Sequence, residues 1–305
     1  MNQLFQTQPM TSAMQAARLR RLRAQYPFVY SKILARTAHG REIPALQLGQ
    51  GDRKLLISAA HHANEYITSM LVWELLERYC RALCCGGRFG GVDAGRLYHG
   101  SMLYLVPMVN PDGVDLVTGA IAPTSAAYHA AQTIAAAFPD IPFPQGWKAN
   151  LDGVDLNLNY PAGWEAARAI KTARGFDRPA PRDYVGARAL SEPESMALAG
   201  YTCCVHPELV LAYHAQGRVI YHRYGALCPP EGERLAAEFA AVTGYAVEDV
   251  PPASANAGYK DWFIQRFRRA GFTLEVGLGE NPLPLTQLPL LCTEHERLWA
   301  VAMQQ

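Results

Sequence analysis

The segment KLLISAA (54–60), followed at once by HHANE (61–65), decides how this chain folds. A short apolar run that ends in polar residues is typical of a strand buried on both faces of a sheet. After the polar pentapeptide, apolar residues from Ile67 to Tyr79 recur at helical spacing. The sequence therefore predicts a buried strand, a polar connection and an amphipathic helix, in that order.

The same alternation of strands and helices extends along the rest of the chain. Strands are predicted at 31–37, 42–49, 102–109, 208–214, 218–222 and 272–276, and helices at 11–25, 231–242, 259–269 and 290–303. Such alternation indicates an α/β fold in which helices cover both faces of one sheet.

The segments between the predicted strands and helices contain motifs for turns and helix starts. NPDG (110–113) predicts a turn after a buried strand. Ser191 and Glu194 predict a capping box at the start of a helix, with Pro193 in its first turn. Between these points, residues 120–191 are rich in Pro, Gly and Ala, which predicts long loops and short helices over one face of the sheet. Loops of that length are usually functional.

The composition bears on partners and on domain organisation. Half of the residues are hydrophobic and 18% are charged, which is the balance of a globular protein. The net charge is +1, so we expect neither nucleic acid nor a membrane as a partner. We found no repeat or linker, and therefore expect a single catalytic domain over residues 1–305, with the helix and hairpin of residues 1–50 packed on it.

The amino terminus and the cysteines bear on the compartment in which the protein works. The first residues show no basic segment followed by an apolar run, which a secretory signal would have. The seven cysteines include the adjacent pairs Cys84-Cys85 and Cys203-Cys204 and form no C-x-x-C motif. This usage is typical of reduced thiols, so we expect a cytoplasmic protein.

Three residues form a candidate metal site. A zinc ion in a hydrolase is often held by two His and one Glu, which leaves a fourth position for water. His62 and Glu65 lie three residues apart where the central strand ends, and His214 closes the apolar run ELVLAYH (208–214). H-x-x-E alone is also common at the surface start of a helix, and His61 is an alternative ligand. Spacing by itself therefore leaves the site open.

Further segments, in a fixed order, carry a resemblance to a known family. They are HHANE (61–65), VNPDG (109–113), GWKANLDGVDLNLNYPAGW (146–164), PRDYVG (181–186), LSEPE (190–194), YHAQG (213–217), AGYKDWFI (257–264) and FTLEVGLGENPLP (272–284). Together they resemble the zinc carboxypeptidase family, and most closely its bacterial branch that cuts γ-D-glutamyl–diamino acid bonds in peptidoglycan peptides. The resemblance implies an eight-stranded mixed sheet flanked by helices, with one zinc ion (Zn2+) at the carboxyl ends of the central strands.

The resemblance also implies a role for individual residues around that zinc ion. His62, Glu65 and His214 correspond to the three ligands. Asp155 corresponds to the carboxylate that accepts a hydrogen bond from the first histidine and so fixes its tautomer.

Two further residues correspond to groups that act in the reaction. Glu275 corresponds to the general base that takes a proton from water and later delivers it to the leaving amine. The alternative for Glu275, which lies within the apolar run FTLEV, is a buried ion-pair partner. Lys148 stands where the family has an arginine that polarises the substrate carbonyl. The alternative for Lys148 is a solvated loop lysine.

The chain differs from ordinary carboxypeptidases of this family at the residues that bind the terminal carboxylate of the substrate. Asn157 matches the asparagine of that grip, but Leu158 stands at the arginine position and Ile264 at the tyrosine position. Neither apolar side chain replaces a charge-assisted bond to a carboxylate. Candidate partners for other charged groups of the substrate are Arg182, Arg218 and Gln216. For both arginines, an exposed solubilising role is the alternative.

The sequence therefore predicts a zinc-dependent peptidase that hydrolyses γ-D-glutamyl–diaminopimelate or γ-D-glutamyl–lysine bonds in peptidoglycan-derived peptides. The alternatives are a conventional metallocarboxypeptidase or a zinc deacylase of N-acyl amino acids. From a different class, the alternative is a catalytically inactive homologue that binds peptides.

Overall fold

The central segment folds as the sequence predicts. The structure is a computed structural model that describes residues 8–304. In it, β3 (Arg53–Ala59) leads through the 3₁₀ helix η1 (Ala63–Glu65) into α2 (Ile67–Cys84). The strand is paired on both sides, with β6 and with β7, and therefore lies in the middle of the sheet.

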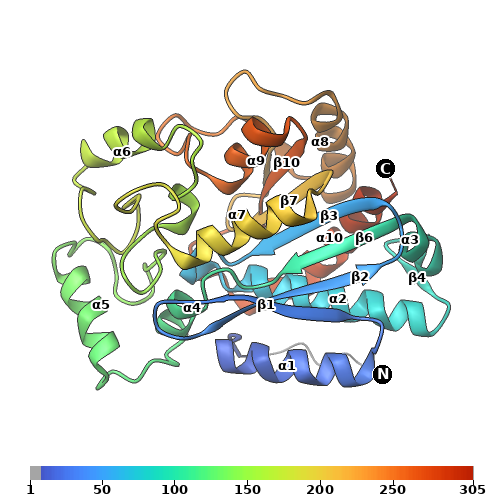
Figure 1. Ribbon diagram of the computed structural model, residues 1–305, viewed down its shortest axis with the longest axis horizontal. Coiled ribbons are helices and arrows are strands. Elements are labelled where there is room, and N and C mark those ends of the chain that lie inside the picture. The colour runs from blue at the N-terminus through green and yellow to red at the C-terminus, as the bar shows by residue number, and fades with distance from the viewer. Residues whose placement is uncertain (1–7, 305) are drawn as a thin grey trace.

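The main sheet has eight strands in the order β1-β2-β6-β3-β7-β10-β8-β9, which confirms the predicted mixed sheet (Figure 1). Its central strands β6, β3, β7 and β10 run parallel, and β2 and β8 flank them in the antiparallel direction. Besides β3, the strands are β1 (Tyr30–Arg36), β2 (Glu42–Gly49), β6 (Ser101–Val106), β7 (Leu209–His214), β8 (Val219–Tyr221), β9 (Ala246–Val247) and β10 (Ala270–Glu275).

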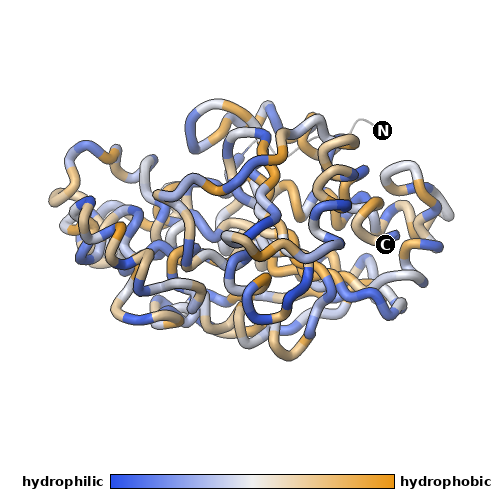
Figure 2. The backbone as a smooth tube through the Cα atoms, turned by 90° about the horizontal axis from the view of Figure 1, so that it is seen from above, coloured by the Kyte–Doolittle hydropathy of each residue, from blue (hydrophilic) through white to orange (hydrophobic). Residues whose placement is uncertain are grey.

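Helices cover both faces of the sheet because β3 is apolar on both. Leu55 and Ile57 pack into one hydrophobic core, and Leu56 packs into a second core on the opposite face. The first core is closed by α1 (Ser12–Gln25), α2, α3 (Ala94–Gly100), α8 (Pro230–Thr243) and α10 (Leu288–Met303), and the second by α7 (Pro193–Val205) and α9 (Tyr259–Phe267). Figure 2 shows apolar positions gathered along the middle of the molecule.

The remaining elements are short and lie in the connections. They are β4 (Arg88–Phe89) and β5 (Val92–Asp93), α4 (Pro111–Val117), α5 (Ala126–Ala136), η2 (Leu156–Leu158), α6 (Trp164–Thr172) and η3 (Leu285–Gln287). The predicted region of long loops and short helices, 120–191, thus contains α5, η2 and α6, which project to one side of the sheet in Figure 1. Within residues 8–304, no helix has the length and apolar character that crossing a membrane requires.

Three local predictions differ from the structure. The hairpin of β1 and β2, which was expected to pack on the domain, forms two strands of the main sheet itself. The predicted turn at 110–113 is the start of α4, because the Asn110 side chain accepts a hydrogen bond from the Gly113 amide and caps the helix. The predicted capping box is wrong: α7 begins after Glu192, and the Ser191 hydroxyl donates to the Glu192 carboxylate instead.

Candidate active site

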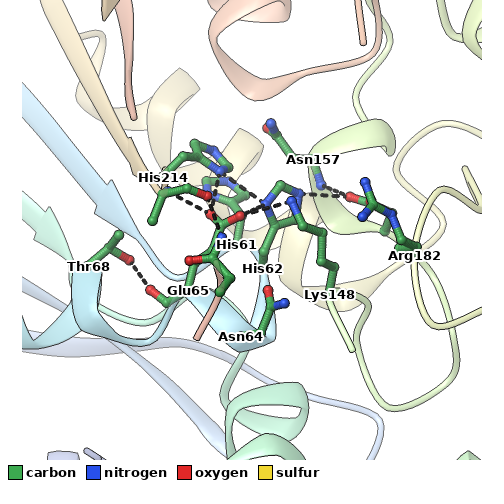
Figure 3. Close-up of polar contacts among 12 residues, drawn as sticks. His61, His62, Asn64, Glu65, Thr68, Lys148, Asn157, Arg182 and His214 are labelled. Atoms are coloured by element: carbon green, nitrogen blue, oxygen red, sulfur yellow. Dashed lines mark hydrogen bonds and ion pairs between the residues drawn. The ribbon is translucent and has the colours of Figure 1, made fainter. Parts of the chain in front are cut away.

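Strand pairing brings the three predicted metal ligands together. β3 and β7 are parallel neighbours, with Ala59 opposite Tyr213, so both strands end at the same edge of the sheet. His62 and Glu65 follow the end of β3, and His214 is the last residue of β7. Figure 3 shows these three side chains pointing toward one another.

The distances among these side chains fit a zinc ion. The Nδ1 atom of His62 lies 2.9 Å from Oε1 of Glu65, and Nδ1 of His214 lies 3.1 Å from Oε2 of Glu65. The two Nδ1 atoms are 3.2 Å apart. Ligand atoms at about 2.0–2.1 Å from a tetrahedral zinc are about 3.3 Å from one another. The distances among these three donor atoms are close to that value. Two nitrogens and a carboxylate converging on one point suit zinc chemically as well.

His61, the alternative ligand, lies outside this group. Its Nε2 atom is 3.1 Å from the hydroxyl of Tyr160, and its ring stacks on that of His214. The side chain is fully buried, and burial lowers the pKa of His61 well below its usual value. His61 therefore supports the site as a neutral packing group.

Asp155 lies behind the first histidine, where the resemblance places it. Its Oδ1 is 3.1 Å from Nε2 of His62, and its Oδ2 accepts a hydrogen bond from the Asp183 amide at 3.1 Å. Although burial opposes it, the imidazole of His62 and the ammonium of Lys148 hold the pKa of Asp155 below its usual value. An ionised Asp155 accepts the Nε2 proton of His62 and leaves the Nδ1 lone pair free for a metal.

Glu275 lies beside the metal site for the same topological reason as His214. It is the last residue of β10, which pairs with β7 in parallel, and stands in register with His214. Burial, and then the charge of Glu65, raise the pKa of Glu275 to about 8. No ion pair joins Glu275 to another residue within 8–304, which argues against the alternative of a buried ion-pair partner. Its environment suits a group that accepts and returns a proton near neutral pH.

Lys148 points into the site and is not a solvated lysine. Its Nζ atom is 3.0 Å from Oε1 of Glu65, and its side chain is 19% exposed. The backbone on either side is fixed: its amide donates to Pro181, and its carbonyl accepts from Ala63. Burial lowers the pKa of Lys148, but the Glu65 carboxylate outweighs this and raises it, so the ammonium stays charged.

A cleft of about 190 Å³ opens beside the metal site. His62, Lys148 and Glu275 are among the residues that line it. Asn157 and Arg182, two of the candidates for substrate binding, also line it. The Asn157 side-chain oxygen accepts from the Tyr259 amide, which leaves its amino group for a substrate. Arg182 donates through Nε to Asp183 at 2.6 Å, which leaves the outer nitrogens of its guanidinium for a substrate.

Three other residues that the sequence associates with substrate binding lie outside the cleft. Gln216 and Arg218 do not line the cleft. The guanidinium of Arg218 donates to Glu294 at 2.7 Å and to the Thr243 carbonyl at 2.9 Å. Ile264 is fully buried and packs near β10, so the expectation that it marks a lost tyrosine grip at the cleft is wrong.

The cleft also holds charged residues that the sequence analysis missed. Lys171, Asp183, Lys260 and Asp261 line it, each of them largely buried. A charged Lys-Asp pair among aromatic residues in AGYKDWFI was the available signal for two of them. The other two lie in the long middle region, where no periodic pattern indicates which side chains turn inward.

A mixed sheet that carries two histidines and a glutamate at the ends of its central strands, with a partly buried glutamate alongside, defines a metal-dependent peptidase of the zinc class. A sequence model of the zinc carboxypeptidase family matches residues 16–297. The chain belongs to this family and is a zinc-dependent hydrolase.

Similar proteins support this placement. The chain is 40% identical over 276 residues to γ-D-glutamyl-L-diamino acid endopeptidase 1 of Lysinibacillus sphaericus, a match that covers 90% of this chain and 67% of that protein. Thrombin-activatable fibrinolysis inhibitor shares the fold with a TM-score of 0.76 at 18% identity, over 97% of this chain and 73% of that one. The murein-tripeptide amidase MpaA of Escherichia coli O157 shares it with a TM-score of 0.53 at 19% identity, over 89% of each chain.

Proposed function

We propose that this enzyme hydrolyses the bond between γ-D-glutamate and a diamino acid in peptidoglycan-derived peptides. The relative from Lysinibacillus sphaericus supports the proposal by its name and by 40% identity over 90% of the chain. The observation that carries it is Leu158 in the cleft wall. Ordinary carboxypeptidases resembling this chain have an arginine at this position, which binds the terminal carboxylate of the substrate. In this cleft the positively charged side chains come from other positions, namely Lys148, Lys171, Arg182 and Lys260.

We propose His62, Glu65 and His214 as the protein ligands of one zinc ion. When bound, zinc acts as a Lewis acid that polarises a carbonyl oxygen and lowers the pKa of water toward about 7. Asp155 keeps His62 in the tautomer that the ligand role requires.

The other groups of the site handle protons and developing charge. Glu275 takes the proton of the attacking water on its carboxylate and delivers it to the nitrogen of the leaving diamino acid. The ammonium of Lys148 stabilises the negative charge that develops on the carbonyl oxygen of the scissile amide. Asn157 and Arg182, which line the cleft beside them, are placed to bind carboxylates of the substrate.

A comparison of substrates tests the proposal. The zinc-loaded enzyme is incubated with L-Ala-γ-D-Glu-diaminopimelate and, separately, with hippuryl amino acids, and kcat/KM is measured for each. We expect release of free diaminopimelate from the tripeptide, and no such release by Glu275→Gln with equal zinc content. Cleavage of hippuryl substrates alone would point to a conventional carboxypeptidase or a deacylase. Absence of any hydrolysis at full zinc occupancy would point to the peptide-binding homologue.

We also propose that the enzyme works in a reducing compartment, the cytoplasm, on free peptidoglycan fragments. The seven cysteines are all unpaired, and Cys84, Cys85, Cys203 and Cys204 are exposed. Exposed unpaired thiols are typical of proteins kept under reducing conditions. Fractionation of cells that produce the protein tests this, with activity in the cytoplasmic fraction as the expected result.

A further inference from the structure

The amino-terminal part of the chain concentrates positive charge. Residues 1–41 contain seven Lys or Arg and no Asp or Glu, and the first acidic residue is Glu42. Because the net charge of the whole chain is +1, the residues from Glu42 onward carry six more acidic than basic side chains. A local excess of one sign attracts partners of the opposite sign, which the net charge does not reveal.

Part of this cationic segment forms one edge of the sheet. Within residues 8–304, β1 pairs with β2 alone, so backbone N–H and C=O groups along its outer side have no strand partner. Figure 1 shows β1 at this edge, beside α1. Three strands separate β1 from β7, and no residue of β1 lines the active-site cleft. The edge is therefore a surface distinct from the catalytic one.

A cationic groove of about 470 Å³ lies on the side of β1 that faces α1. Arg20 and Arg23 of α1 and Arg36 of β1 line it, and all three are exposed. Among the residues that the structure describes, Glu42 is the single acidic residue that lines this groove, and it pairs with Arg36. Arg20 and Arg23 have no ion-pair partner within residues 8–304, so their charges are available to a ligand.

An apolar groove of about 460 Å³ lies on the other side of β1, where α7 packs against the strand. Ile33 and Met196, which line it, are 43% and 48% exposed. Lys32 is the one charged residue in its lining among the described residues, and the Lys32 ammonium lies 4.6 Å from the centre of the Tyr201 ring. The two sides of the edge strand therefore differ in chemistry.

This difference predicts the residue pattern of a segment that would pair with β1. An added strand forms main-chain hydrogen bonds with the edge, and its successive side chains point to opposite faces of the sheet. On one face they would meet the cationic groove, and on the other the apolar groove. The register of β1 shifts between Ile33 and Ala35, so regular pairing is limited to about the first half of the strand.

We propose that β1 is a docking edge for an extended segment of a partner protein in which acidic and apolar residues alternate. The acidic side chains contact Arg20 and Arg23, and the apolar side chains fill the groove beside Met196. A second copy of this chain is a poor occupant, because pairing of β1 with itself would bring Lys32 and Arg36 of both copies together. Nucleic acid would contact the cations through phosphates and leave the apolar groove and the backbone edge unused.

Three fluorescent peptides of the length of β1 test the proposal by anisotropy. In the first, Glu and Val alternate; in the second, the same residues stand in two blocks; in the third, proline replaces the central valine of the first. We expect the alternating peptide to bind at least about 10-fold more tightly than either of the others. The block peptide cannot satisfy both grooves, and proline lacks the N–H that strand pairing requires.

Reversal of two charges tests the cationic groove. Arg20→Glu combined with Arg23→Glu should weaken binding of the alternating peptide by more than about 10-fold at low ionic strength, and by less at high ionic strength. The matched control is Arg174→Glu combined with Arg297→Glu, which changes the charge equally at two exposed arginines outside both grooves. We expect the control to keep the Kd, and both proteins to keep the Tm, of the unaltered enzyme.

Several outcomes would overturn the docking edge. Equal binding of the alternating and block peptides to the unaltered enzyme would exclude strand pairing with two different faces. A single-stranded oligonucleotide of equal charge that binds as tightly as the alternating peptide would indicate a general polyanion surface instead. Absence of binding of the alternating peptide at about 1 mM would also overturn it. These three outcomes use the unaltered enzyme, so they hold even if a variant fails to fold.

Discussion

The two walls of the cleft are built in different ways. One wall consists of residues at the ends of parallel strands: His62, which follows β3, and Glu275, the last residue of β10, which stands in register with His214 of β7. The other wall consists of residues from loops and helix ends, among them Lys171 in the last turn of α6 and Lys260 in the first turn of α9, whose positions depend on local tertiary contacts. Under the proposed function, the strand ends supply most of the reaction chemistry, and the connections supply the contacts to the rest of the substrate.

The largest expected effect comes from removing a group at the strand ends. His214→Ala deletes one of the three proposed zinc ligands, so we expect loss of bound zinc and a fall in kcat/KM of more than about 10⁴-fold, beyond the range of a single acid–base group. Elemental analysis and the tripeptide assay measure the two losses. Retention of one zinc ion per chain with near-normal activity would contradict the assignment of this wall.

Glu275→Gln separates proton transfer from metal binding on the same wall. The amide keeps the size of the side chain but cannot accept a proton, so we expect kcat to fall by about 10³-fold while zinc content stays constant. Stopped assays with matched enzyme concentration give kcat, and elemental analysis gives the zinc content. A loss confined to KM would show that Glu275 binds substrate and does not move a proton.

Lys148 comes from a loop but contacts the metal site. It therefore tests whether residues outside the strand ends also take part in the reaction. Lys148→Met keeps the length of the chain and removes the charge, and we expect kcat to fall by about 10²-fold. Lys148→Arg should recover much of the loss, because a guanidinium also stabilises a developing oxyanion. Equal loss in both variants, with unchanged zinc content, would mean that Lys148 acts through packing alone.

The smallest expected effect is on zinc affinity, through Asp155. Asp155→Asn weakens the acceptor for Nε2 of His62, so we expect the zinc Kd to rise by about 10- to 100-fold. Competition with a chelator measures the affinity, and activity at saturating zinc should stay within a few-fold of that of the unaltered enzyme. An unchanged Kd would show that the backbone alone fixes the orientation of His62.

The two walls of the cleft also differ in how well the sequence predicts the residues that form them. His62, Glu65 and His214 sit at the ends of apolar runs whose strand character is readable, so the edge where they meet was predictable. Residues 120–191 contain only short periodic pieces between loops, and these did not indicate that Lys171 lines the cleft.

At three positions, tertiary contacts or local geometry gave a residue a different role from the one that its sequence motif indicated. Arg218 follows the YHAQG segment, yet Glu294 on α10 draws its guanidinium away from the cleft. Ile264 lies next to the cleft-lining turn in sequence, but the helical period of α9 turns it into the core. At 110–113, the same Asn-Pro pair that signals a turn is also a helix cap followed by a first-turn proline.

The central claim is that one zinc ion, held by His62, Glu65 and His214, makes this chain a γ-D-glutamyl peptidase. Titration of zinc into metal-free enzyme, with release of diaminopimelate from L-Ala-γ-D-Glu-diaminopimelate as the readout, tests it directly. We predict that activity rises linearly with added zinc and levels off at one ion per chain. Activity that is already full without zinc, or that never appears with it, would contradict the claim.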